Sequence, residues 1–314
     1  MLSFSSKYYL KIIKYLKDDG GKARIVGGAV RDAILGISGA DIDIATDLTP
    51  DQVTSILQER GVKVIPTGIK FGTITAVVKG ESFEITTLRS DILCDGRHAD
   101  VQYSNDFEED AKRRDFTINA LSYCPIERKI FDYFGGIEDI KLGRVVFIGN
   151  AYARIQEDYL RILRFFRFSC LCAKTINKEG LDACIDNKNH LSKLSRERIK
   201  SEMDSLILLP KSPDVLSVMY ESEILEEIFP SWKYDAKKHF AALEIANSFG
   251  VDLNKTTIYA VMCMYFDDIS HDALLKLKFS RSEANSIINK LSLKNISVDL
   301  KMETKLKSIW FEDE

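Results

Sequence analysis

Two aspartates that lie two residues apart are the most chemically informative feature of the sequence. Asp41 and Asp43 belong to the stretch DIDIAT, residues 41–46, whose alternating pattern predicts a strand. A strand directs both carboxylates to one face and sends Ile42 and Ile44 into the core. Neighbouring carboxylates repel each other unless a cation lies between them, and such pairs hold the two metal ions of nucleotidyl transfer. We therefore predict that Asp41 and Asp43 are catalytic ligands of Mg²⁺.

A pair of glycines precedes these aspartates. The strand-like run ARIV, residues 23–26, leads into Gly27 and Gly28 and then into a helical stretch. Glycines allow backbone N–H groups to approach a triphosphate closely, and both the helix N-terminus and Arg31 favour its negative charge. We expect Gly27, Gly28 and Arg31 to bind a nucleotide.

A third carboxylate would complete the metal site. Glu84 lies in a later strand-like run, residues 82–88, and is our candidate for that ligand. The alternative is that Glu84 is an ordinary surface residue.

The first 140 residues or so must position these groups, and their pattern is that of a sheet with helices packed against it. Short strand-like runs occur at residues 23–26, 41–46, 63–66, 73–79 and 82–88, and helical stretches at 9–16, 30–35 and 50–60. From about residue 150 onward, the apolar residues recur at helical spacing. The composition changes near residues 143–149, which we predict to be the boundary.

The composition excludes several classes of protein. The chain has 314 residues, of which 45% are hydrophobic and 29% charged, and this is typical of a globular protein with more than one domain. No apolar run is long enough to span a membrane, and the six scattered cysteines suggest reduced thiols in the cytoplasm. The formal net charge is −3, but residues 141–200 contain thirteen Lys and Arg against six Asp and Glu. Any contact with nucleic acid should therefore be local.

Eight motifs in order resemble those of the class II CCA-adding enzymes, which are tRNA nucleotidyltransferases of the polymerase-β-like superfamily. The motifs are GGAVRD, GADIDIAT, FEITTLR, DGRHADV, RRDFTINAL, FDYFGGIEDIKLGRV, RIQEDYLRILRFFRF and SRERIKSE. The resemblance covers roughly residues 20–205. It implies template-independent addition of C, C and A to the 3′ end of tRNA from CTP and ATP, with release of pyrophosphate.

The resemblance also implies an α+β fold with three parts. These are a polymerase-β-like nucleotidyltransferase head with a small mixed sheet over residues 1–140, a helical neck over 141–204, and a helical body and tail over 205–314 that bind tRNA. The resemblance leaves the oligomeric state open.

Further site residues are carried over from the matching motifs. Asp158 and Arg161 correspond to the residues that read the base, and the chemistry agrees because Asp only accepts and Arg only donates hydrogen bonds. Other residues are expected near the ribose and the phosphates or along the tRNA. The nucleotide contacts are Arg114, Asp115, Asn119 and Arg164, and the tRNA contacts are Arg97 and Arg167. Glu197 and Arg198 are interpreted as structural.

Three alternatives stay open. Bacterial poly(A) polymerases share the head, but they typically have Asp-Pro-Val-Arg where this chain has Asp158-Tyr159-Leu160-Arg161. A partial enzyme that adds only CC or only A has the same motifs. A non-catalytic RNA-binding module is a third possibility, and the intact pair Asp41 and Asp43 argues against it.

Overall fold

The computed structural model describes residues 2–91, 101–230, 233–248, 254–263 and 269–292. The chain divides into two compact units, residues 1–150 and 151–314, which we call the α/β unit and the helical unit. The division falls ten residues beyond residue 140, where the sequence suggested the head would end. The separation of the helical part into neck and body remains a prediction.

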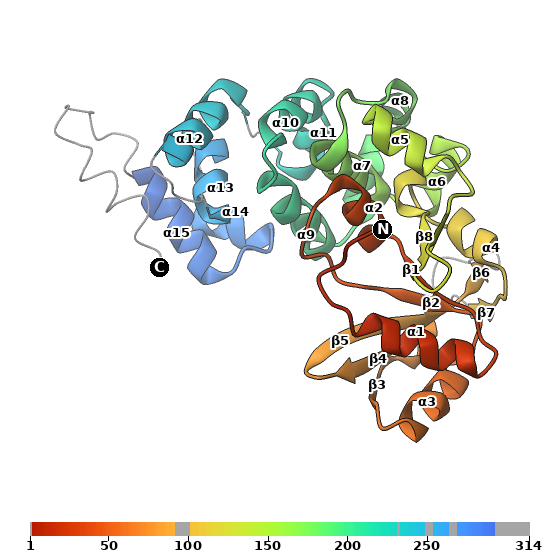
Figure 1. Ribbon diagram of the computed structural model, residues 1–314. Helices are drawn as coiled ribbons and strands as arrows, with labels where there is room; N and C mark the ends of the chain where they lie inside the picture. The colour runs from red at the N-terminus through yellow and green to blue at the C-terminus, as the bar shows by residue number, and fades with distance from the viewer. Residues whose placement is uncertain (1, 92–100, 231–232, 249–253, 264–268, 293–314) are drawn as a thin grey trace. The chain divides into compact units, whose positions relative to one another are not determined.

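A seven-stranded mixed sheet forms the centre of the α/β unit (Figure 1). Its order is β3-β4-β5-β2-β1-β8-β9, and the only parallel pair among these described strands is β2 with β5. That pairing places Ile44 beside Ile85. The strands are β1 (Ala23–Val26), β2 (Ile44–Thr46), β3 (Lys63–Gly68), β4 (Thr73–Val78), β5 (Glu81–Thr87), β8 (Ser122–Cys124) and β9 (Lys129–Phe131), and β6 (Arg89–Asp91) pairs separately with β7 (Val101–Tyr103).

The helices of the α/β unit are held by their apolar faces. α1 (Tyr9–Asp18) buries Ile12, Ile13 and Leu16, which confirms the helical spacing read from the sequence. α3 (Pro50–Glu59) starts at a capping box between Thr49 and Gln52. α1 and α3 contact each other and the sheet (Figure 1). The remaining elements are α2 (Gly28–Leu35), α4 (Phe107–Lys112), α5 (Gly136–Leu142) and the 3₁₀ turns η1 (Ile69–Phe71) and η2 (Thr117–Asn119).

The second unit is helical throughout its described residues, as the sequence pattern predicted. α7 packs against α9 and α10, and α13 packs against α15. Phe165 and Phe166 of α7 are fully buried. The helices are α6 (Ala151–Glu157), α7 (Leu160–Cys172), α8 (Lys178–Asn187), η3 (Lys188–Lys193), α9 (Arg196–Ile207), α10 (Ser212–Glu221), α11 (Ile224–Ile228), α12 (Ala236–Ser248), α13 (Lys255–Cys263), α14 (His271–Lys276) and α15 (Arg281–Ser292).

Asp204 of α9 connects α9 to α13. Its carboxylate accepts hydrogen bonds from Lys200 at 2.8 Å, from Lys255 at 3.0 Å and from the hydroxyl of buried Tyr259 at 2.9 Å. A carboxylate with three donors is well satisfied, so this cluster fixes the two helices in register.

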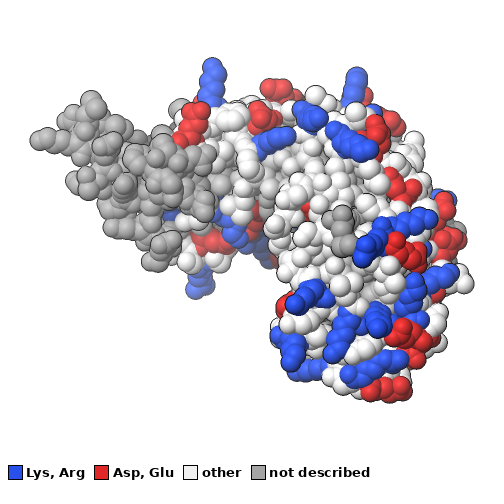
Figure 2. Space-filling model, in the orientation of Figure 1, with Lys and Arg blue, Asp and Glu red and all other residues white. Residues whose placement is uncertain are grey.

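The surface charge is mixed. Lys and Arg side chains gather over the face of the α/β unit that carries α1, where Lys11, Lys14 and Lys17 are exposed, and acidic side chains are interspersed at its margin (Figure 2). No helix within the described ranges is long and apolar enough to cross a bilayer. The five cysteines in those ranges are free thiols.

Candidate active site

The Gly27-Gly28 turn joins β1 to α2, as the sequence predicted. Gly27 is the residue before the helix and has φ 68° and ψ −129°, a backbone conformation that favours glycine. A Cβ atom at Gly27 would lie only 2.7 Å from the Nη1 atom of Arg114. The turn therefore requires glycine both for its conformation and for the close approach of this guanidinium.

Asp41 and Asp43 lie directly before β2. The predicted strand over residues 41–46 is too long, because regular pairing begins only at Ile44. The alternation of side chains is nevertheless present, since Ile42 and Ile44 are buried while Asp41 and Asp43 are exposed. The two aspartates thus face solvent just before β2, while the burial of Ile42 and Ile44 holds the backbone between and after them against the core.

Asp43 lies where negative charge accumulates. Its pKa is raised to about 6, first because the surrounding protein desolvates the carboxyl group and then because Glu84 and Asp41 add negative charge. Arg114 acts in the opposite direction. A divalent cation would relieve this repulsion, so the donor set fits a metal ion of the kind that carboxylates prefer.

Glu84 is a neighbour of Asp43 through the parallel pairing of β2 with β5. Ile44 pairs with Ile85, so Asp43 and Glu84, which precede these two residues on parallel segments, lie side by side. Within the described residues, however, no group of three His, Cys, Asp or Glu side chains is placed to hold one ion. The structure therefore brings Asp43 close to both Asp41 and Glu84 without arranging all three around one ion, and the role of Glu84 as a ligand stays a prediction.

A buried network connects several of the predicted nucleotide-binding residues. The Nη1 atom of Arg31 donates to Oδ1 of Asn119 at 2.6 Å, and Nδ2 of Asn119 donates to Oδ1 of Asp115 at 3.0 Å. Asp32 also binds the guanidinium of Arg31, at 2.7 Å. Arg31, Asp115 and Asn119 are each only 6% exposed. The sequence predicted that Arg31 offers its positive charge to a nucleotide. In the structure the Arg31 side chain is instead buried and holds Asn119 and Asp32 beneath the Gly27-Gly28 turn.

Arg114 is the predicted cation that lies beside the turn. Its guanidinium donates to the Asn119 carbonyl oxygen at 3.3 Å and to Oδ2 of buried Asp110 at 3.2 Å. Burial alone would raise the pKa of Asp110, but Arg114 and Arg113 lower it below its usual value. Asp110, which the sequence reading missed, thus stays ionised and holds Arg114 next to Gly27.

The predicted base-reading residues lie where α6 ends and α7 begins, and we call residues 157–161 the template turn. Asp158 lies between the two helices, and Arg161 is in the first turn of α7. One carboxylate oxygen of Asp158 accepts the Leu160 N–H at 3.1 Å, and the other accepts from Arg198 of α9 at 2.8 Å. Arg161 donates to Glu157 at 2.6 Å and to the Arg154 carbonyl oxygen at 2.8 Å. The contact of Arg198 agrees with its predicted structural role, but its target was not foreseen.

Arg164 and Arg167 project from the next turns of α7 towards one acidic side chain. Nε of Arg167 lies 2.8 Å from Glu202 of α9, and Nη1 of Arg164 lies 3.7 Å from the same carboxylate. Both side chains remain partly exposed, Arg164 at 31% and Arg167 at 25%. Arg97, the other predicted tRNA contact, lies outside the described residues.

Comparison with known proteins shows which family the chain resembles. A family model described as poly A polymerase head domain matches residues 23–146, and one described as probable RNA and SrmB-binding site of polymerase A matches residues 175–235. The chain is 38% identical over 274 residues to the human mitochondrial CCA tRNA nucleotidyltransferase 1, covering 83% of this chain and 60% of that protein. It is 37% identical over 221 residues to the CCA-adding enzyme of Bacillus subtilis, covering 70% of this chain and 54% of that protein.

Solved structures give the same result. The structure of the Bacillus stearothermophilus CCA-adding enzyme in complex with CTP matches with a TM-score of 0.74 at 30% identity, over 92% of this chain and 70% of that one. The chain spans about three fifths of the length of the human relative. From its motifs, its fold and these relatives, the chain belongs to the family of the CCA-adding enzymes, with a polymerase-β-like nucleotidyltransferase head.

Proposed function

We propose that this protein adds CCA to the 3′ end of tRNA from CTP and ATP. The observation that carries the proposal is the joint placement of the Gly27 turn, the aspartate pair and Arg114 at one end of the central strands β1 and β2. Relatives at 37% and 38% identity are named for this activity, which supports the same function here. Reduced thiols and the bacterial relatives favour action in the cytoplasm.

In the proposed reaction, the 3′-hydroxyl oxygen of the RNA forms a bond to the α-phosphorus of the nucleotide, and the bond to the leaving pyrophosphate breaks. Asp41 and Asp43 would hold the divalent cations, for which we propose Mg²⁺. Bound there, such ions supply Lewis-acid stabilisation of the phosphate oxygens and favour ionisation of the attacking hydroxyl. Mg²⁺ commonly uses one or two carboxylates together with substrate phosphates, so two aspartates are sufficient.

The remaining residues would bind and select the nucleotide. The turn at Gly27-Gly28, where α2 begins, and the guanidinium of Arg114 would bind the triphosphate, because a helix N-terminus and a guanidinium both favour negative charge. The Gly27 N–H donates to the Leu121 carbonyl oxygen at 3.0 Å, and Gly28 and Arg114 are both partly exposed, so we assign the phosphate contact to Gly28 and Arg114. Asp158 would accept from the base and Arg161 would donate to it, matching the mixed edges of C and A. Arg164 and Arg167 would contact the RNA or the nucleotide through their exposed portions.

A test of the activity uses the full chain with tRNA that lacks its 3′ end, supplied with CTP, ATP or both. Extension by two residues with CTP and by a third when ATP is added would support the proposal. Arrest after CC, or addition of A alone to a CC end, would identify a partial enzyme instead. Long A tracts on RNAs other than tRNA would identify a poly(A) polymerase, and tRNA binding without extension would identify a non-catalytic module.

A further inference from the structure

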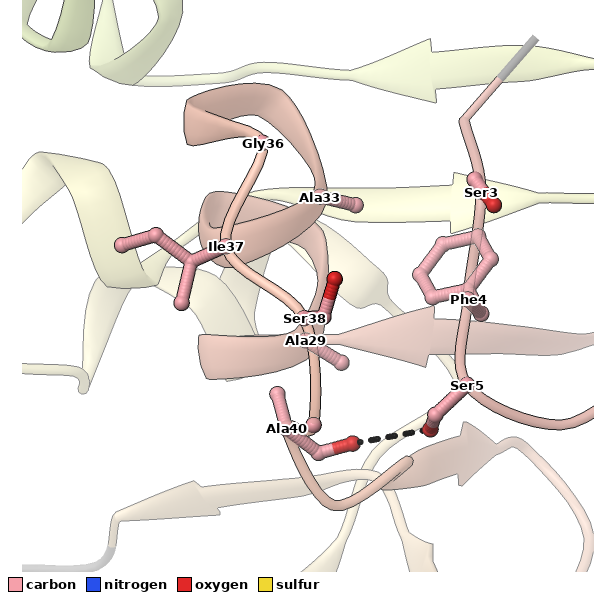
Figure 3. Close-up of a pocket in the computed structure, with 10 residues that line it drawn as sticks. Ser3, Phe4, Ser5, Ala29, Ala33, Gly36, Ile37, Ser38 and Ala40 are labelled. Carbon is pink, nitrogen blue, oxygen red and sulfur yellow. Dashed lines mark hydrogen bonds between the residues drawn. The ribbon is translucent and has the colours of Figure 1, made fainter.

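The chain before α1 lies alongside the residues that lead to the aspartate pair. Residues 3–5, which we call the strap, border a cavity of about 150 Å³. Its opposite wall consists of Ala29 and Ala33 of α2 and of residues 36–40, which we call the aspartate loop because Asp41 follows it (Figure 3). The cavity exists because this wall has only small side chains apart from Ile37.

The aspartate loop has few interactions of its own. It contains two glycines with positive φ, Gly36 at 73° and Gly39 at 93°, and no heavy atom lies within 4 Å of the Cβ position of either. The Ser5 hydroxyl donates to the Ala40 carbonyl oxygen at 3.4 Å (Figure 3). In the described part of the chain, no other hydrogen bond reaches residues 38–42. The residue before Asp41 is thus contacted by the strap.

The strap is itself fixed to the core of the α/β unit. The ring of Phe4 packs edge-on against Tyr9 of α1, with ring centroids 5.3 Å apart, and lies 5.7 Å from the ring of Tyr123 on β8. Tyr9 and Tyr123 are both buried, at 8% and 3% exposure. Aromatic pairs of this geometry contribute beyond the area they bury. Phe4 therefore connects the strap to a helix and to the central sheet.

We propose that the strap is a positioning element for Asp41. Phe4 anchors the strap, and the strap restricts the aspartate loop, so that Asp41 is held near Asp43 before a cation binds. Restricting the loop reduces the entropy that cation binding and catalysis must otherwise overcome. The inference rests on the proposed function, because that function assigns Asp41 to the metal ions.

The test compares Phe4→Ala with the wild-type full chain by two measurements. One is the affinity for Mn²⁺ alone, followed by the loss of the free-ion signal in electron paramagnetic resonance. The other is the division of the nucleotide-addition rate into kcat and KM for CTP. We expect Phe4→Ala to weaken Mn²⁺ binding about fivefold and to lower kcat about tenfold, with KM for CTP changed less than about twofold.

Three further variants separate positioning from general loss of stability. Phe4→Tyr keeps the ring and should restore both measurements. Ser5→Ala leaves the anchor in place, so it should fold normally and weaken Mn²⁺ binding by about twofold, since only one exposed hydrogen bond is lost. Leu10→Ala removes an apolar side chain that is 41% exposed on the same helix α1, and it should change neither measurement.

The outcomes are distinguishable. Unchanged Mn²⁺ affinity and kcat in folded Phe4→Ala, or an equal loss in Leu10→Ala, would overturn the positioning role while leaving the proposed function intact. An Asp41→Asn variant serves as the reference for the metal site. If wild type and Asp41→Asn bind Mn²⁺ equally and neither extends tRNA, the proposed function fails and the inference fails with it.

Discussion

The aspartate pair and the template turn handle charge in opposite ways. Asp43 lies near two other carboxylates and has a raised pKa, so like charges are crowded together at the end of a strand. In the template turn, Asp158 pairs with Arg198 and Arg161 pairs with Glu157. One region is electrostatically incomplete without a cation, whereas the other is neutralised within the protein.

This difference agrees with the ligand that we propose for each region. A cation site must keep its negative charge uncompensated, and it accepts a cost in stability for doing so. A site that reads a neutral base edge needs oriented donors and acceptors, and salt bridges provide that orientation. The ion pair that supports the first region, Arg114 with Asp110, is buried on its acidic side at 5% exposure, while the Asp158–Arg198 pair is 36% and 48% exposed.

Asp43→Asn should have the largest effect on the rate of nucleotide addition. The change keeps the size of the side chain and removes the charge that would hold the cation, so the rate of nucleotide addition should fall about 10³-fold or more. The folded state should persist, as checked by circular dichroism. Single-turnover assays with saturating CTP measure the rate.

Glu84→Gln is the matched control for that experiment, since Glu84 is the adjacent carboxylate on β5. We expect a loss of less than about tenfold, because no three carboxylates of the described residues are placed to hold one ion and Mg²⁺ commonly uses one or two carboxylates together with substrate phosphates. A loss as large as that of Asp43→Asn would establish Glu84 as the third ligand.

Asp110→Asn should have the largest effect on stability. Removing one partner of a buried ion pair leaves Arg113 and Arg114 without their carboxylate and should cost about 3 kcal/mol at pH 7. Because the pKa of folded Asp110 is lowered, its contribution is present above the unfolded value of 3.8 and is lost as pH falls through the folded pKa. Urea unfolding at pH 7, 5 and 3 checks this, since the difference from wild type should shrink only at the lowest pH.

Asp158→Ala should mainly affect the choice of nucleotide. Loss of one base-reading acceptor should reduce the preference for CTP over UTP by about 10- to 100-fold in kcat/KM, which corresponds to 1–3 kcal/mol. The rate of addition of the wrong nucleotide should change little. An equal fall in both rates would mean that Asp158 contributes to folding or catalysis rather than to selection.

Arg198→Ala should have the smallest effect on stability and still alter selection. Its pair with Asp158 is exposed, so the free energy of unfolding should drop by less than about 1 kcal/mol. The discrimination between CTP and UTP should fall by about threefold to tenfold, because Asp158 keeps its charge but loses one orienting contact. Arg196→Ala, which changes another arginine of α9, should leave this discrimination unchanged.

The sequence indicated several of these features through local periodicity. The spacing of Asp41 and Asp43, the burial of Ile42 and Ile44 between them, and the apolar face of α1 all follow from repeats of two or 3.6 residues. The three-residue strands β8 and β9 were not expected, because strands so short contain too little alternation to be recognised. The sequence also placed the start of β2 at residue 41, three residues too early. Buried and exposed residues already alternate over residues 41–43, although regular pairing with a neighbouring strand begins only at Ile44.

Other features were decided only by the tertiary structure. Arg31 and Asn119 are 88 residues apart in the chain, and Asp158 and Arg198 are 40 apart, so nothing local indicates that they meet. Glu84 becomes a neighbour of Asp43 only because β2 and β5 pair in parallel, and Phe4 reaches Tyr123 only because β8 enters the same sheet. The sequence by itself thus determined which groups are present and which local face each occupies. Which charges compensate one another depends on contacts between distant segments, and those contacts form only when the whole core packs.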